Sequence, residues 1–322
     1  MNANAEQLNN EGVQYFLRGK FSDAKRKYEQ ALELSPSHTT TLNNLGMVFL
    51  QEKDYKLAED YFKKAISITE KASYFANLGH VYANQNELAL AEQQYIKAIE
   101  KDQKSIAAHK SLASLYQYVG NYENSIQIWS YILSELSNDA QFKINLAKDH
   151  IQLKSYAIAM ELLMEVTQQD TYNHVAYYYI SLIQLHHKNF GLAMESIYRS
   201  LSIEPNSIEY RKLAATIHVS LSEFDEANKH WEFILNIDEN HHQTRIDKAI
   251  VLLSRKRFDE ALQELNRVLK SEESNFKAMF YKATVLLEMQ ETDQALNLLN
   301  ELSKNKNPFQ QKSQTIINDL KA

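Results

Sequence analysis

Residues 5–38 read AEQLNNEGVQYFLRGKFSDAKRKYEQALELSPSH, and the same pattern of small and large residues returns about every 34 residues along the chain. In its first half, apolar residues from Leu8 to Phe16 recur at helical spacing. Gly19 interrupts this pattern, because glycine adopts a left-handed turn without strain. A second apolar stripe follows, and Pro36 ends it because proline cannot continue a helix interior. The stretch therefore predicts two antiparallel helices.

Two series of small residues keep this period through the whole chain. The first series steps by 34 residues, with one step of 33: Gly12, Gly46, Gly79, Ala113, Ala147, Ser181, Ala215, Ala249 and Ala283. The second series follows twelve places later: Ala24, Ala58, Ala91, Ser125, Ala159, Ala193, Ala227, Ala261 and Ala295. Small residues let two helix axes approach closely. A fixed period of this length predicts an array of helix pairs that stack on one another.

This pattern resembles the tetratricopeptide repeat. Residues 39–71 carry the family's large, small and aromatic residues at Leu42, Leu45, Gly46, Phe49, Tyr55, Ala58, Phe62 and Ala65. The resemblance extends over residues 5–309. It implies an all-α fold, a right-handed superhelical α-solenoid of about nine helix-turn-helix repeats.

We expect the solenoid to form one domain over residues 1–322. The expected repeats are 5–38, 39–71, 72–105, 106–139, 140–173, 174–207, 208–241, 242–275 and 276–309. Asn307 and Pro308 then mark a new helix start, since asparagine caps helices and proline is tolerated in their first turn. Residues 310–322 are expected to be a capping helix over the last repeat, as such arrays require.

The composition limits the classes of partner. The formal net charge is −6 and charges of both signs are mixed, so a nucleic-acid partner, which needs a positive groove, is disfavoured. Cysteine is absent, which excludes disulfides and thiolate metal sites. Neither a leader pattern at the first residues nor a membrane-length apolar run is visible. We expect a cytoplasmic protein without membrane insertion, or a periplasmic one if a leader has been removed.

Candidate catalytic and metal-binding residues are few. Histidines occur as the adjacent pairs His186-His187 and His241-His242. Neighbouring residues in a helix point about 100° apart, so such pairs seldom chelate one ion. The chain contains no phosphate-binding loop and no nucleophile motif. We therefore expect no enzymatic activity, no catalytic residue, no cofactor and no metal.

In the family, six positions of each first helix line a concave inner groove, and here one of these positions is rich in asparagine. The sixth position in the first five repeats reads Asn10, Asn44, Asn77, Ser111 and Asn145. A primary amide carries both donor and acceptor, so it can hold the N–H and C=O of an extended peptide. Similar ladders bind extended segments in the family, and the resemblance implies a peptide site here. The alternative is that asparagine is merely a tolerable solvent-facing residue.

One well-known family site is missing. The carboxylate clamp for chaperone C-termini requires lysine and arginine at set groove positions. The first three repeats instead offer Asn9, Val13, Asn44, Ser73 and Asn77, of which only Asn44 matches. We therefore do not expect this clamp.

The groove changes character in the later repeats. Lys148 is followed in the next repeat by Tyr178, Tyr179 and Leu182 at inner positions. Such residues suit apolar anchors of a partner, or they are buried between tightly packed repeats.

The sequence as a whole predicts a non-enzymatic adaptor that binds an extended peptide or partner segment in the groove. The alternative is a self-associating structural scaffold, which would form a homo-oligomer through its uncapped N-terminal helix, or an assembly factor of a larger complex.

Overall fold

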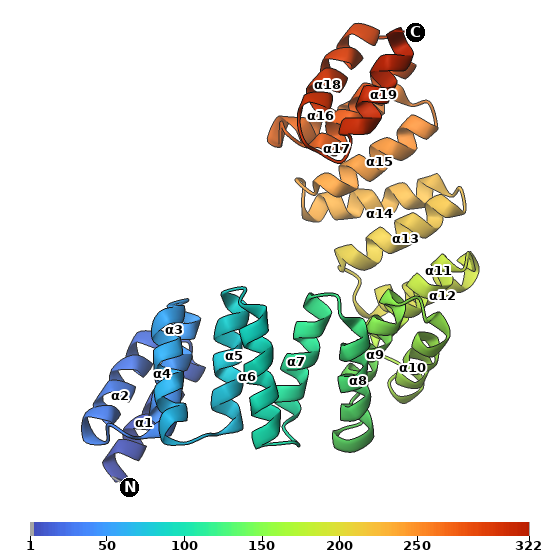
Figure 1. Ribbon diagram of the computed structural model, residues 1–322. Helices are drawn as coiled ribbons and strands as arrows, with labels where there is room; N and C mark the ends of the chain where they lie inside the picture. The colour runs from blue at the N-terminus through green and yellow to red at the C-terminus, as the bar shows by residue number, and fades with distance from the viewer. Residues whose placement is uncertain (1–2, 322) are drawn as a thin grey trace. The chain divides into compact units, whose positions relative to one another are not determined.

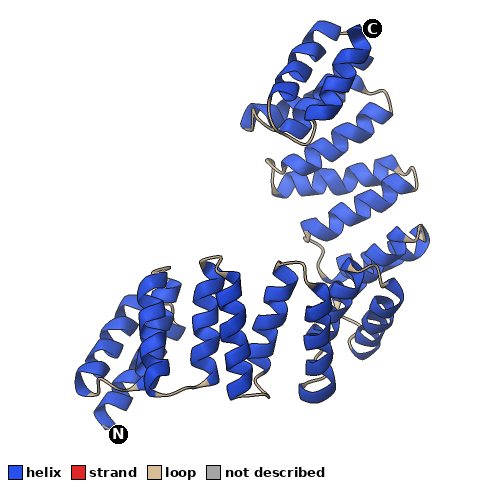
Figure 2. Ribbon diagram, in the orientation of Figure 1, coloured by secondary structure: helices blue, strands red, loops and turns tan. Residues whose placement is uncertain are grey.

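The computed structural model describes residues 3–321, and α-helices joined by short turns make up almost all of this part of the chain (Figures 1 and 2). The described residues form two compact units that divide after Val166. The predicted all-helical repeat solenoid is confirmed. None of the helices among the described residues is both long and apolar enough to cross a membrane.

The first unit contains α1 (Ala3–Leu17), α2 (Phe21–Leu34), α3 (Thr39–Gln51), α4 (Tyr55–Ile68), α5 (Ala72–Asn84), α6 (Leu88–Lys101), α7 (Ile106–Tyr118), α8 (Tyr122–Tyr131), a π-helical turn (Ile132–Leu136), α9 (Ala140–Gln152) and most of α10 (Tyr156–Gln169). The second contains α11 (His174–His186), α12 (Phe190–Ile203), α13 (Ile208–Ser220), α14 (Phe224–Ile237), α15 (His242–Ser254), α16 (Phe258–Ser271), α17 (Phe276–Glu288), α18 (Thr292–Lys304) and α19 (Gln310–Lys321).

Stacking follows the order of the chain. In the first unit α1 packs on α2, α2 on α3 and α3 on α4, and first helices of neighbouring repeats, such as α5 and α7, also touch. At the C-terminal end, α19 packs on α18 and buries Ile317 against Leu299. A helix therefore does cover the last repeat, over the residues where the sequence places a capping helix.

The turn inside each helix pair has one repeated feature. A residue with positive φ stands at the same position in nine successive turns: Gly19, Lys53, Asn86, Gly120, Lys154, Lys188, Ser222, Lys256 and Gln290. Only two of these residues are glycine, although the left-handed region is costly for the others. The packing of the two helices therefore imposes the turn, even where the residue type opposes it.

The helix pairs close at the periodic small residues. A Cβ added at Gly12, Gly46 or Gly79 would lie 2.5, 2.7 or 2.5 Å from a ring carbon of Tyr28, Phe62 or Tyr95. These rings are fully or almost fully buried. Where the first helix carries alanine instead, the residue opposite is often aliphatic, as in the buried pair Ala249 and Leu265. At these three positions glycine makes room for the ring, whereas Ala113 and Ala215 share buried clusters with Trp129 and Trp231.

This contact predicts an unusual result for Gly46→Ala. Alanine favours a helix by about 1 kcal/mol over glycine, but its methyl group would overlap the buried Phe62 ring, and overpacking costs about 1–3 kcal/mol. We expect a lower urea midpoint for Gly46→Ala. In a Phe62→Leu background the same substitution should raise the midpoint, because the ring is gone.

The matched control is Gly191→Ala. Gly191 lies in α12, and a Cβ there would meet no atom within 4 Å. This variant should be slightly more stable than the parent, through helix propensity alone. A gain of stability in Gly46→Ala without the Phe62 change would show that the ring contact does not limit this position.

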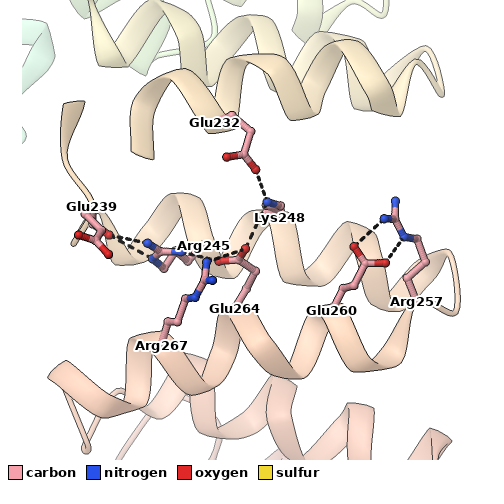
Figure 3. Close-up of polar contacts among 8 residues, drawn as sticks. All are labelled: Glu232, Glu239, Arg245, Lys248, Arg257, Glu260, Glu264 and Arg267. Atoms are coloured by element: carbon pink, nitrogen blue, oxygen red, sulfur yellow. Dashed lines mark hydrogen bonds and ion pairs between the residues drawn. The ribbon is translucent and has the colours of Figure 1, made fainter. Parts of the chain in front are cut away.

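The second unit contains a buried ion cluster that joins three helices (Figure 3). Glu264 of α16 accepts from Arg245 of α15 at 2.6 Å and lies 3.2 Å from the Lys248 ammonium. Arg245 also donates to the carbonyl oxygen of Glu239 before α15, at 2.9 and 3.1 Å. Lys248 reaches back to Glu232 on α14. Arg245 and Glu264 are only 6% exposed, so the cluster replaces apolar packing with charge.

We predict that Glu264→Gln destabilises the protein by about 3–5 kcal/mol, because a buried cation loses its counter-charge. The control is Arg257→Gln. Arg257, the residue before α16, makes a bidentate bond at 2.6 Å to Glu260 in the first turn of that helix, but both side chains are about half exposed (Figure 3). Exposed pairs contribute little, so this variant should unfold like the parent. If the two variants changed the free energy of urea unfolding equally, the buried and the exposed ion pair would not differ in their contribution to stability, against this prediction.

Candidate functional site

Five asparagine side chains in the first unit form one hydrogen-bonded chain across three repeats. Asn44 Nδ2 donates to Asn9 Oδ1 at 2.9 Å, and Asn77 Nδ2 donates to Asn43 Oδ1 at 2.8 Å. Longer contacts of 3.4 and 3.5 Å link Asn9 to Asn10 and Asn43 to Asn44. Asn9 and Asn43 are buried, whereas the other three are half-buried or exposed. The buried Asn9 and Asn43 therefore fix the orientation of Asn10, Asn44 and Asn77, which we call the outer asparagines.

The outer asparagines retain unused hydrogen-bonding capacity. Each amide has two N–H groups and a carbonyl with two lone pairs. Asn77 uses one N–H toward Asn43, and among the described residues nothing donates to its Oδ1. Asn44 uses one N–H toward Asn9. Each of the two therefore still has a donor, and Asn77 also an acceptor, for an outside group.

Three other predicted site residues of these repeats lie outside the chain of hydrogen-bonded asparagines: Ser111, Asn145 and Lys148. Ser111 Oγ donates to the Ala107 carbonyl of its own helix at 2.9 Å and lies 3.5 Å from His80 Nε2. Asn145 Oδ1 accepts from Gln141 one turn earlier, at 3.4 Å. Lys148, one turn after Asn145, is half-buried. The structure thus brings Asn10, Asn44 and Asn77 together, with Ser111 beside a histidine.

A cleft lies between α5 and α7 where the asparagine chain ends. One part, of about 520 Å³, is lined by His80, Ala83, Asn84, Leu88, Tyr95, Ala107, Lys110, Ser111, Ser114, Leu115 and Tyr118. An adjoining part, of about 510 Å³, includes Asn77 and shares His80, Ala107 and Ser111 with the first. Both are within the size range of ligand pockets. His80 stands where the two parts meet.

The environment of His80 determines which of its two ring nitrogens carries the proton. Tyr95 Oη lies 2.9 Å from His80 Nδ1, and the two rings meet edge to face. Burial lowers the pKa of His80 below its ordinary value, and burial raises the pKa of Tyr95 to about 12. Both groups are therefore neutral at neutral pH. Tyr95 Oη has no other acceptor among the described residues, so it donates to Nδ1 and leaves the proton of His80 on Nε2, next to Ser111.

His80 was not among the site residues predicted from the sequence, and the structure adds it as a candidate. Its only signal was position: it takes the groove place that Val13 and Met47 take in the two preceding repeats. Its partner Tyr95 is a buried residue of the periodic core pattern, so nothing in the sequence marks its hydroxyl as the group that orients His80.

The predicted aromatic residues lie in the second unit and are engaged there. Tyr178 Oη donates to Glu209 at 2.8 Å, and its ring lies 5.1 Å from those of both Tyr179 and Tyr210. Leu182 packs against the buried cluster of α12 and α13. Burial and the bond to Glu209 raise the pKa of Tyr178. These contacts agree with packing between repeats as well as with a role in binding.

We predict that the His80 ring titrates below its ordinary pKa of about 6.5. Its folded pKa is depressed, so the unfolded chain takes up this proton first, and the histidine's contribution to stability is lost as pH falls below the unfolded value. Nuclear magnetic resonance of the ring would show a low midpoint and an Nε2–H tautomer. A midpoint above 6.5 would contradict the neutral donor.

Comparisons with known proteins identify the repeats of this chain. Models described as tetratricopeptide repeat match residues 5–71, 72–104 and 252–311. A DnaJ homolog subfamily C member 7 homolog of Dictyostelium discoideum is 22% identical over 70% of this chain and 45% of its own length. Anaphase-promoting complex subunit 3 of Schizosaccharomyces pombe is 31% identical over 19% of this chain and 9% of its own length. The chain thus spans less than half of either relative.

Solved structures share the fold at low identity. The C-terminal part of a TPR repeat-containing protein from Cytophaga hutchinsonii has a TM-score of 0.59 at 16% identity, covering 73% of this chain and 97% of that one. A hetero-tetramer of the anaphase-promoting complex has a TM-score of 0.57 at 16% identity, covering 89% of this chain and 57% of that one. Proteins with these repeats mediate protein–protein interactions and complex assembly. The chain belongs to the tetratricopeptide repeat family.

Proposed function

We propose that this protein is a non-enzymatic adaptor whose first unit binds an extended segment of a partner protein. The segment would lie along Asn10, Asn44 and Asn77 and enter the cleft around His80. The observation that carries the proposal is the chain of hydrogen-bonded asparagines, which ends at the cleft and still has unused donors and acceptors.

The hydrogen-bonding groups that the asparagines leave unused match those of an extended backbone. An extended backbone presents unpaired N–H and C=O groups, as a primary amide does. Each bond contributes about 0.5–1.5 kcal/mol net, so several bonds and an anchor are needed to offset the ordering of a flexible segment. Asn9 and Asn43 already hold the outer amides in place. Binding then costs little further side-chain entropy at these positions.

The same face continues along α9, where Asn145 and Lys148 occupy groove positions of the next repeat. We include them in the proposed site. Tyr178, Tyr179 and Leu182 are proposed as a separate contact of the second unit. Two of the similar proteins are an anaphase-promoting complex subunit and an anaphase-promoting complex hetero-tetramer, which favours a role for this chain in an assembly.

A triple variant tests the proposal. We expect Asn44→Ala, Asn77→Ala and Asn145→Ala together to abolish binding of peptides that are selected from a random twelve-residue display library on the intact protein. The reason is that this variant lacks the side-chain amides that would bond to the backbone of the peptide. Affinity would be measured by fluorescence anisotropy with synthetic copies of the selected peptides.

The control carries Asn266→Ala and Asn297→Ala, two exposed asparagines on α16 and α18. It should bind like the parent. Circular dichroism must show the same helicity for both variants, since Asn44 and Asn77 also bond to buried neighbours. Full affinity of the triple variant for every selected peptide would refute the proposed site.

A further inference from the structure

The part of the cleft next to Tyr118 has an apolar interior. Ala83, Leu88 and Leu115 line it together with the rings of Tyr95 and Tyr118. Tyr118 is 73% exposed, which is unusual for a large aromatic residue in this protein. At about 520 Å³ the space accepts a large aliphatic or aromatic side chain. Exposed aromatic surface around a pocket is typical of anchor sites.

One charged group lies at this pocket. Lys110 is exposed, and the lining holds no carboxylate and no other lysine or arginine. Its ammonium lies 5.6 Å from the centre of the Phe142 ring and forms no ion pair with any residue between 3 and 321. A cation without a carboxylate partner, beside an apolar pocket, favours an acidic ligand.

The charge of the surrounding groove points the same way. In the four repeats from residue 39 to residue 173, the groove positions carry Lys110 and Lys148 and no aspartate or glutamate. This contrasts with a chain whose net charge is −6. The carboxylates near the adjoining part of the cleft are engaged: Glu70 pairs with Lys101 at 2.5 Å, and Asp102 accepts from the Lys104 backbone N–H. The two lysines that line this part, Lys71 and Lys101, thus equal its two carboxylates in number.

We propose that the partner segment places a large apolar side chain in this pocket and pairs an adjacent aspartate or glutamate with Lys110. His80 Nε2–H donates to a backbone carbonyl next to the anchor. This inference rests on the proposed function and names the chemistry of the segment that the groove takes. The pocket selects the anchor by size, and Lys110 selects the sign of the neighbouring charge.

The test uses peptides selected from the same random library on the intact chain. We expect the selected sequences to share a large apolar residue next to an acidic one. Ser114→Trp, which fills the pocket from an exposed lining position, should weaken them at least tenfold. Lys110→Glu should do the same, and a peptide with lysine in place of its acidic residue should regain affinity for Lys110→Glu. Lys64→Glu, an exposed change on α4, is the matched control and should bind like the parent.

The outcomes separate this inference from the proposed function. Peptides that need Asn44 and Asn77 but carry a basic residue or no charge beside the anchor would overturn the inference and leave the adaptor proposal intact. The inference would also be overturned, with the adaptor proposal left intact, if Lys110→Glu and Ser114→Trp bound peptides that carry an apolar and an acidic residue as tightly as the parent does. Peptides that bind the triple asparagine variant at full affinity would overturn both.

Discussion

The fold depends on the contact that a small residue of each first helix makes with the side chain sixteen places later. At Gly12, Gly46 and Gly79 the facing group is a buried ring, and a single added carbon would come within 2.7 Å of it. Interiors packed this closely do not yield easily to an extra methyl group. Because the small residues repeat along the chain, the helix pairs close in a similar way, and stacking of such pairs produces the array.

This arrangement leaves the inner face of the first helices free to vary. The crossing contact uses one side of each first helix, so asparagine, histidine or lysine can occupy the opposite side without disturbing the pair. The first unit uses this freedom for a connected row of amides. The second unit joins neighbouring repeats differently, through the buried cluster around Glu264. Polar groups thus link repeats in both units, and in the first unit they also leave donors and acceptors unused beside a cleft.

Features that depend on residue spacing could be predicted from the sequence, whereas features that depend on contacts between repeats could not. The period gave the helix pairs, and Asn307 with Pro308 indicated the last helix. The conformational freedom of Gly19 explains the turn only in part, because Lys53 adopts the same left-handed conformation in the next repeat. Asn10, Asn44 and Asn77 were predicted as site residues, but their bonds to Asn9 and Asn43 could not be. Those bonds join residues about 34 positions apart, and their direction depends on how the repeats stack.

Under the proposed function the asparagines both join repeats and bind the ligand, and this has a consequence for specificity. An amide that bonds to the next repeat is rigid, and a rigid row reads the backbone of a ligand without regard to its side chains. Such a row provides affinity but little selectivity, so discrimination has to come from elsewhere in the groove. His80 and Lys110 are suited to this, because one is a neutral donor of fixed direction and the other a cation that forms no ion pair with any described residue. A groove that separates these tasks can keep its stacking bonds unchanged while the residues that line the cleft determine which partner is bound.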